Sequence, residues 1–192
     1  MSQDTLVELR PIGLDSFPAL RHIHSLAFRT HLGSDLSEDQ LDALVDFVHT
    51  PQYVELILQT ECLGAWIEDR LCATGSWMPG GSSGANAKLI GVCVDPLFSG
   101  LGLGRRLVGE IEARARRAGF VVITARAPVA IAPFFNRLGY FGTSRGVWAT
   151  PCGVSVPVLH MRNGAAKEVA DVVHRPDLGQ RSVRAAGLTR LH

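Results

Sequence analysis

The sequence predicts a mixed α/β fold, in which one central sheet carries helices on both of its faces. The chain has 192 residues, of which 46% are hydrophobic and 19% charged, a composition typical of one globular domain with a substantial core. Short apolar runs of strand length alternate with amphipathic segments of helical period. A glycine-rich run separates one buried strand from the helix that follows it. The expected order of elements is βααβββαβαββ.

The first part of the chain predicts one strand and two helices. The strand covers residues 7–11, and Asp15 or Ser16 can cap the helix after it. Ser37 opens a Ser-Glu-Asp-Gln segment, which has the form of a capping box and predicts a second helix that ends near Pro51. Residues 54–59 fit either a helix or a strand. The first helix presents an apolar face made of Phe17, Leu20, Ile23, Leu26 and Ala27.

Three strands are expected next, at residues 62–67, 71–78 and 89–94. Glu68-Asp69 forms a candidate hairpin turn between the first two strands. Residues 79–86 are rich in Gly and Ser and predict a mobile loop. The third strand is a continuous apolar run that ends at Asp95-Pro96, as expected of a buried central strand.

The rest of the domain alternates helices and strands. Residues 102–118 have the pattern of an amphipathic helix, with apolar residues every four positions and Gly119 as its C-cap. A buried strand at 120–125, a short helix at 130–138 and two closing strands at 142–148 and 154–162 follow. We therefore assign residues 1–162 to one domain. Residues 163–192 are too few to build a core of their own, and we expect a C-terminal extension of one helix and a tail.

Composition argues against several classes of protein. The formal net charge is +1, which disfavours a protein that binds nucleic acid mainly through phosphate contacts. The N-terminus lacks the pattern of a signal peptide, and no run of about 18 apolar residues predicts a membrane span. The four cysteines form no CxxC pair and no His/Cys cluster with zinc spacing. We therefore expect no metal site, reduced thiols and a cytoplasmic location.

The glycine-rich run from Ser99 to Arg105 is the most informative segment. Closely spaced glycines allow the backbone to approach an anion and to turn its N–H groups toward it, and the following helix adds the positive end of its dipole. The glycines stand at 100, 102 and 104, a spacing that does not match G-x-G-x-x-G, and no Gly-Lys-Ser/Thr follows. The run therefore predicts a pyrophosphate-binding loop outside the two common nucleotide motifs; a tightly packed turn is the structural alternative.

The sequence around this run resembles the GNAT (Gcn5-related) family of acetyl-CoA-dependent N-acetyltransferases. The family's V-x-P strand end and the R/Q-x-x-G-x-G/A opening of a helix correspond to Val94-Asp95-Pro96 and to the segment 99–104. A later A-x-x-F-Y-x-x-x-G-F element corresponds to residues 133–140. The resemblance implies a GNAT-type mixed central sheet and acetyl-CoA as the acyl donor, with no metal.

The resemblance also implies a set of CoA-binding residues. Backbone N–H groups of the glycine run would hold the pyrophosphate, and the strand before it would pair with the pantetheine arm. A divergence of this strand from the strand at 120–125 would admit the thioester. The implied residues are Val92, Cys93, Val94, Ser99, Gly100, Leu101, Gly102, Leu103, Gly104, Arg105, Phe134 and Phe135.

Three positions depart from the family pattern. Ser99 stands where the family has Arg or Gln, Phe135 stands at the frequent general-acid tyrosine, and Pro128 stands where an asparagine is common. Phe135 has no proton to donate, so the acid must come from elsewhere. Tyr140 and Tyr53 are the candidate acids.

Acyl transfer to an amine also needs a base and a donor for the developing oxyanion. The candidate bases are Glu55, Glu61, His22 and His24. A backbone N–H near Val94 is the candidate oxyanion donor. From these alternatives we select Tyr140, Glu55 and Val94 as the predicted catalytic groups.

Three functional hypotheses follow. The first is direct transfer of an acetyl group from acetyl-CoA to a primary amine of a small molecule or a peptide. The second is a non-catalytic module that senses acyl-CoA, motivated by Phe135 and Pro128, and the third is a nucleotide-binding protein. Apart from the amine substrate, we expect neither a nucleic acid nor a membrane as a binding partner. The open edges of such a sheet make a homodimer an expected alternative to a monomer.

Overall fold

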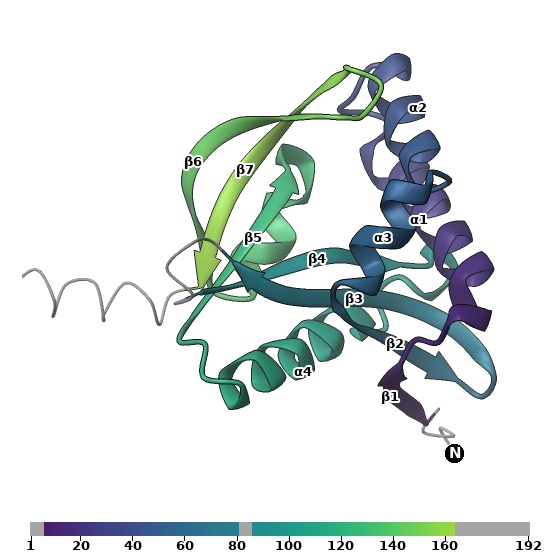
Figure 1. Ribbon diagram of the computed structural model, residues 1–192, viewed down its shortest axis with the longest axis vertical. Helices are drawn as coiled ribbons and strands as arrows, with labels where there is room; N and C mark the ends of the chain where they lie inside the picture. The colour runs from purple at the N-terminus through teal and green to yellow at the C-terminus, as the bar shows by residue number, and fades with distance from the viewer. Residues whose placement is uncertain (1–5, 81–85, 164–192) are drawn as a thin grey trace, which may run out of the picture.

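A computed structural model of the protein describes residues 6–80 and 86–163. Its centre is a seven-stranded sheet with the strand order β1-β2-β3-β4-β5-β7-β6. The neighbouring strands are antiparallel except for β4 and β5, which are parallel. Helices lie on both faces of this sheet (Figure 1). The predicted mixed α/β fold is confirmed.

The N-terminal elements follow the predicted order with one addition. A third helix occupies the segment 54–59 that the sequence left between helix and strand. Its first turn explains this outcome, because Thr50 accepts a hydrogen bond from the Tyr53 amide and Pro51 occupies the first helical position. The elements are β1 (Val7–Pro11), α1 (Phe17–Leu32), α2 (Glu38–Phe47), α3 (Pro51–Leu58), β2 (Glu61–Ile67) and β3 (Arg70–Gly80), with a 3₁₀ turn η1 (Leu14–Ser16).

The C-terminal elements also follow the prediction. They are β4 (Asn86–Val94), α4 (Leu103–Arg117), β5 (Val122–Pro128), α5 (Ala132–Arg137), β6 (Tyr140–Ala149) and β7 (Ser155–Asn163), with 3₁₀ turns η2 (Pro96–Phe98) and η3 (Val129–Ile131). The predicted loop at 79–86 was too long, because Pro79 pairs with Ala87 and Gly80 with Asn86 in the sheet. Residues 81–85 and the predicted extension at 163–192, apart from Asn163, lie outside the described residues.

Two apolar layers hold the helices to the sheet. Helix α4 packs on one face, where Leu107 and Ile111 are fully buried against β2, β3 and β4. Helices α1 and α3 pack on the opposite face, where Leu20, Ile23 and Ile57 form a second buried cluster. The two faces match the apolar stripes expected of amphipathic helices on a sheet.

Two irregularities of β4 shape the centre of the sheet. The first is the end of its pairing with β5: the register stops at Leu89 and Ala125, although both strands continue. From there β5 pairs with β7 alone, and Figure 1 shows β5 diverging from β4. The second is a bulge against β3, where Gly91 has a φ of +61°. The first irregularity leaves the C-terminal half of β4 without a partner on its β5 side.

Candidate active site

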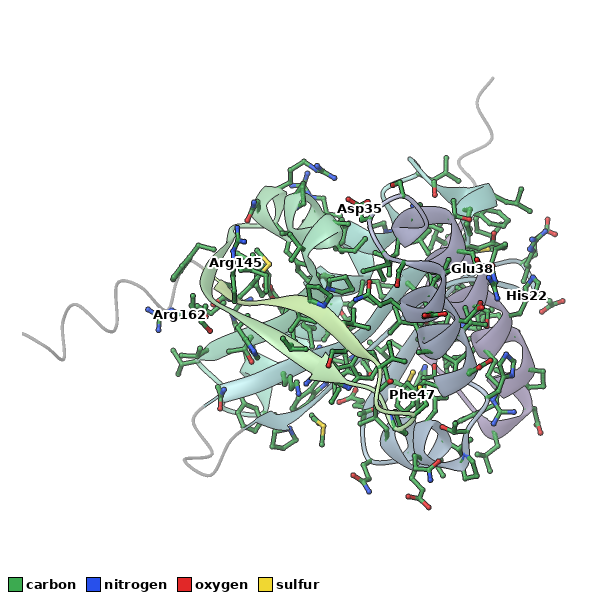
Figure 2. The ribbon with its side chains drawn as sticks, turned by 90° about the horizontal axis from the view of Figure 1, so that it is seen from above. His22, Asp35, Glu38, Phe47, Arg145 and Arg162 are labelled. Atoms are coloured by element: carbon green, nitrogen blue, oxygen red, sulfur yellow. The ribbon has the colours of Figure 1, made fainter. Side chains whose placement is uncertain are left out.

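One cavity of about 730 Å³ lies where β4 and β5 diverge. The glycine run and α5 line it on one side, and helices α1, α2 and α3 line it on the other. The β6–β7 hairpin closes over it, since Trp148 packs edge-on against Phe47 with ring centroids 5.3 Å apart. Figure 2 labels Phe47 near the tip of this hairpin. The cavity therefore connects the two faces of the sheet.

A buried carboxylate fixes the chain where it leaves β4. Asp95 is 2% exposed, and its amide donates to the Cys72 carbonyl of β3 at 2.8 Å. Its carboxylate accepts a hydrogen bond from the Leu97 amide at 3.0 Å and from the Arg70 guanidinium at 3.0 Å. The Val94-Asp95-Pro96 segment thus holds the turn that leads into the glycine run, which explains why an Asp stands between the strand and the proline.

Two glycines of the run have left-handed backbone conformations. Gly100 has a φ of +83° and Gly102 a φ of +75°, and a β-carbon at either position would meet nothing within 4 Å. Residues other than glycine adopt these angles at a cost of about 1–2 kcal/mol. Since no protein atom fills the space beside these glycines, the backbone is open to a ligand.

Helix α4 begins directly after Gly102 with no side chain capping its first turn. The first amide to bond within the helix is that of Arg106, which donates to the Gly102 carbonyl at 3.0 Å. The N–H groups of Leu103, Gly104 and Arg105 precede it and have no partner inside the helix. Unbonded N–H groups and the positive end of a helix dipole favour the binding of an anion such as a pyrophosphate.

The third glycine of the run has a different role. A β-carbon on Gly104 would lie 3.2 Å from the Phe134 ring and 3.3 Å from Cγ2 of Val94. Gly104 therefore allows the start of α4 to approach both β4 and α5 closely. This close packing is what places the free N–H groups next to the unpaired part of β4.

The backbone of β4 supplies a donor at the divergence. Amides of a strand point alternately to its two neighbours. Because the Asp95 amide donates to β3, the Val94 amide points to the opposite side, where β5 no longer pairs. This N–H is the group predicted from the sequence as the oxyanion donor, and its direction is compatible with that prediction.

A buried polar chain lines the cavity on the side of α1. His24 is 2% exposed, and its Nδ1 lies 2.9 Å from the Tyr53 hydroxyl while its Nε2 lies 2.7 Å from Oγ1 of Thr74. Thr74 donates its hydroxyl proton to the Gly91 carbonyl at 3.3 Å, so it accepts from His24. We therefore assign the proton of neutral His24 to Nε2, and Tyr53 donates its hydroxyl proton to Nδ1.

Burial sets the protonation of this chain. It lowers the pKa of His24 to about 4, so the imidazole is neutral at neutral pH. Burial also raises the pKa of the Tyr53 phenol above its usual range, and the nearby Cys93 and Cys62 thiols act in the same direction. Tyr53 therefore remains protonated, with its oxygen lone pairs available to a hydrogen-bond donor in the cavity.

The residues predicted to bind CoA lie close together in space. All of them line the cavity except Leu101, which is 61% exposed. Cys93 lines the cavity from a buried position, and burial raises its pKa to about 12. A neutral thiol at this position is a poor nucleophile.

The predicted acid and base lie elsewhere. Tyr140 is 2% exposed, and its hydroxyl donates to Oε1 of Glu112 at 2.6 Å in the core beneath α4. Glu55 is exposed on α3. Among the described residues that line the cavity, neither is present.

Of the other candidate acids and bases, some line the cavity and some lie away from it. Glu61 accepts hydrogen bonds from Trp77 and Arg114 at the sheet edge beside α4. His22 is exposed, and Figure 2 shows it pointing away from the molecule. Only Tyr53 and His24 among the alternative acids and bases line the cavity.

His24 could have been placed from the sequence. Phe17, Leu20, His24 and Ala27 follow a helical spacing of three and four residues, so His24 lies on the buried stripe of α1. Thr74 and Gly91 carry no comparable signal, since their roles depend on the bulge in β4.

Within residues 6–80 and 86–163, no three His, Cys, Asp or Glu side chains gather closely enough to hold a metal ion. No helix in the same part of the chain is long and apolar enough to cross a membrane.

Comparisons with known proteins point to one family. Residues 18–140 match the family model described as the acetyltransferase (GNAT) family. A search among curated proteins found no significant match.

Solved structures with the same fold carry related names. A GCN5-related N-acetyltransferase from Rhodopseudomonas palustris is similar with a TM-score of 0.74 and 20% identity, over 85% of this chain and 98% of that one. The PaiA N-acetyltransferase from Thermoplasma acidophilum, solved in complex with coenzyme A, has a TM-score of 0.64 and 14% identity over 82% and 98%. The ribosomal-protein-S18-alanine N-acetyltransferase from Escherichia coli has a TM-score of 0.56 and 15% identity over 82% and 93%.

Proposed function

The chain belongs to the acetyltransferase (GNAT) family, and from this premise we propose that it transfers an acetyl group from acetyl-CoA to a primary amine of a small molecule or a peptide by direct transfer. One observation carries the proposal. The cavity at the divergence of β4 and β5 joins the open N–H groups of the glycine run to the buried His24–Tyr53 pair. A donor bound on one side of the sheet thus meets an acceptor that enters from the other side.

The loop fits the donor in shape and charge. The N–H groups of Leu103, Gly104 and Arg105 would hold the pyrophosphate at the N-terminus of α4, with the Arg105 side chain close by. Ser99, which stands at the family's Arg or Gln position, also lines the cavity and can donate a hydroxyl hydrogen bond. Val92, Cys93 and Val94 offer strand backbone to the pantetheine amides.

The chemistry requires a neutral amine and a stabilised oxyanion. The amine nitrogen attacks the thioester carbonyl, and the Val94 N–H stabilises the oxygen that becomes negative. The carbon–sulfur bond then breaks, and the proton that leaves the nitrogen ends on the CoA sulfur. Before it attacks, a lysine-like ammonium must lose a separate proton to solvent, which at pH 7 costs roughly 4–5 kcal/mol, so the site must favour the neutral amine.

We assign this task to Tyr53 and His24. Because the Tyr53 hydroxyl proton is held by His24, a phenol lone pair can accept a hydrogen bond from an N–H of the amine. Their apolar surroundings disfavour an ammonium ion and so favour the nucleophilic form. Tyr53 would touch the substrate, whereas His24 acts through Tyr53 as a positioning residue.

A second function is favoured by one residue. Phe135 lines the cavity where the family often has a tyrosine, and it packs between Phe134 and Tyr140. It donates no proton to a departing thiolate. An acyl-CoA-sensing module without turnover is therefore the alternative.

Acetyl-CoA turnover against an amine panel separates the two functions. We expect release of free CoA thiol with at least one amine, and a reduction of about tenfold to hundredfold in kcat/KM for Tyr53→Phe. Tight acetyl-CoA binding without thiol release for any amine would support the sensor. Absence of acetyl-CoA binding by calorimetry would refute both.

Cellular location and oligomeric state also stay predictions. A cytoplasmic location is supported by four free cysteines, of which Cys72 and Cys93 are buried as thiols. A homodimer stays a prediction, and sedimentation of the full chain tests it.

A further inference from the structure

A second hollow of about 420 Å³ adjoins the cavity on the face of the sheet opposite α4. Its charged groups come from three neighbouring strands: Lys88 on β4, Arg126 on β5 and Arg162 on β7. His160 and Ser144 add polar side chains. Lys88 and Arg126 also line the main cavity, so the two spaces share a wall.

The sheet register places these side chains together. Lys88 pairs with Thr124, and Thr124 pairs with Arg162, so the three form one row across β4, β5 and β7. Arg126 pairs with His160, which forms the next row on the same face because residues two apart point the same way. The cluster is thus built on rigid strands.

Within residues 6–80 and 86–163, no carboxylate lies beside these cations. The hollow has no carboxylate in its described lining, and the sequence has no Asp or Glu between Glu112 and Glu168. None of the ion pairs in residues 6–80 and 86–163 involves Lys88, Arg126 or Arg162. The Nε atom of Arg162 is buried without a hydrogen-bond partner in this same part of the chain.

Holding these charges together without an anion has a physical cost. Burial lowers the pKa of Lys88, and the neighbouring Arg126 lowers it further. Burial also lowers the pKa of Arg126. An oxyanion in the hollow would relieve both effects and would satisfy the Arg162 donor.

The phosphates of CoA do not explain the cluster. Lys88 and Val94 lie six residues apart on β4, about 20 Å along the strand, and the glycine run follows Val94. The cluster and the pyrophosphate loop therefore lie toward opposite ends of β4. The cluster adjoins the part of the cavity where β4 and β5 are still paired.

We propose that the cluster of Lys88, Arg126 and Arg162 is a subsite for an anionic group on the acceptor, so that the amine substrate also carries a carboxylate or a phosphate. This proposal rests on the proposed acetyltransferase function and specifies its substrate class. Figure 2 shows Arg162 at the β6–β7 side of the molecule, together with Arg145. Arg145 follows Ser144 on β6 and does not line the hollow, which makes it a matched control.

The kinetic test compares acceptors of similar length. We expect ω-amino acids, in a series from 4-aminobutanoate upward, to exceed the alkylamine and the diamine of the same chain length in kcat/KM, and ω-aminoalkyl phosphates, from 2-aminoethyl phosphate upward, to exceed the corresponding amino alcohols if the anion is a phosphate. The preference should be largest at the chain length that spans the distance from Val94 to Arg126, the cluster residue nearest the divergence. Arg126→Gln and Lys88→Gln should each reduce the preference for the anionic amine by about tenfold to hundredfold, mainly through KM. Arg145→Gln should leave it unchanged, and Arg126→Glu should shift preference toward the diamine of the same length.

A binding test separates this subsite from the acetyl transfer itself. Calorimetry of the full chain with CoA measures affinity for the same series of ω-amino acids and ω-aminoalkyl phosphates. Binding that is lost in the Lys88→Gln/Arg126→Gln variant and retained in Arg145→Gln supports the subsite even if no amine is acetylated. A wild-type preference for neutral or cationic amines overturns the proposal. So does an anionic preference that survives in the double variant, or the absence of binding and turnover for every anionic probe in both series.

Discussion

The Cε1 atom of His24 lies 3.0 Å from the position that a β-carbon would occupy on Gly91. The imidazole edge of α1 therefore rests on the bulge of β4, and only a glycine leaves room for it. The same histidine bonds Thr74, which bonds the Gly91 carbonyl. The contact between His24 and Gly91 thus joins α1 to β4, the strand that diverges from β5.

Gly91→Ala tests this contact. A β-carbon at a φ of +61° adds strain of about 1–2 kcal/mol and displaces His24, so we expect lower stability and reduced turnover. Thermal unfolding and acetyl-CoA turnover measure the two effects. Gly109→Ala is the control, because its β-carbon meets nothing within 4 Å and the helix gains about 1 kcal/mol. Unchanged activity in Gly91→Ala would contradict the proposed coupling.

Gly102→Asp tests the pyrophosphate loop. A carboxylate at the N-terminus of α4 would repel the phosphates, so we expect loss of measurable CoA binding by calorimetry. Gly102→Asn introduces a similar backbone cost without the charge and should weaken binding less.

Gly119→Asp serves as the control for backbone strain in this comparison. Its φ is +95° and it follows the other end of α4, so CoA affinity should be unaffected. Equal affinities in the Gly102→Asp and Gly102→Asn variants would argue against an anion at this helix terminus.

The buried imidazole predicts a pH dependence of stability. The folded pKa of His24, about 4, lies below its ordinary value of 6.5. The unfolded chain therefore binds more protons between these values, and the free energy of unfolding falls as the pH drops from 6.5 to 4. The full effect is about 3 kcal/mol, and it is absent above pH 6.5.

Urea unfolding at pH 7.5 and pH 5 checks this prediction with two matched variants. In His24→Gln the loss of unfolding free energy between the two pH values should be about 2 kcal/mol smaller than in the wild type. His22→Gln changes an exposed histidine of the same helix and should retain the wild-type dependence. An identical pH dependence in His24→Gln would show that His24 is not buried as a neutral group.

Direct transfer predicts that Cys93 is dispensable. Since burial raises its pKa to about 12, the thiol is un-ionised at neutral pH. Cys93→Ala should retain turnover at a stability cost of about 1 kcal/mol. Iodoacetamide at pH 7.5 should label the exposed Cys152 in the native protein before Cys93. An acetylated Cys93 intermediate in mass spectrometry would refute direct transfer.

Several parts of the site were predictable from local patterns. The glycine run follows a buried apolar strand and opens an amphipathic helix, and both the loop and the helix form where expected. The pyrophosphate binding that we propose for this run depends on backbone N–H groups and on positive φ angles, which glycine spacing predicts. The predicted CoA-binding residues other than Leu101 all line one cavity.

The groups proposed to act on the amine, Tyr53 and His24, were harder to predict because they come from distant elements. Tyr140 bonds Glu112 beneath α4, and Glu55 is exposed on α3, whereas His24 and Tyr53 meet in the cavity although they are 29 residues apart. Spacing along a chain does not report which face of a sheet a helix covers. That information requires the packing of His24 of α1 on the bulge at Gly91 and the contact of Tyr53 of α3 with His24.

The sequence by itself determined the order of the elements and the presence of a glycine-rich loop at the start of a helix, because helical period, strand alternation and glycine spacing are local properties. Only the tertiary structure decided which titratable groups meet at the divergence of β4 and β5. It also brought Lys88, Arg126 and Arg162 together from three strands. The physical reason is that sheet register and helix packing join residues far apart in the chain, and it is their shared burial that changes the chemistry of His24 and Lys88.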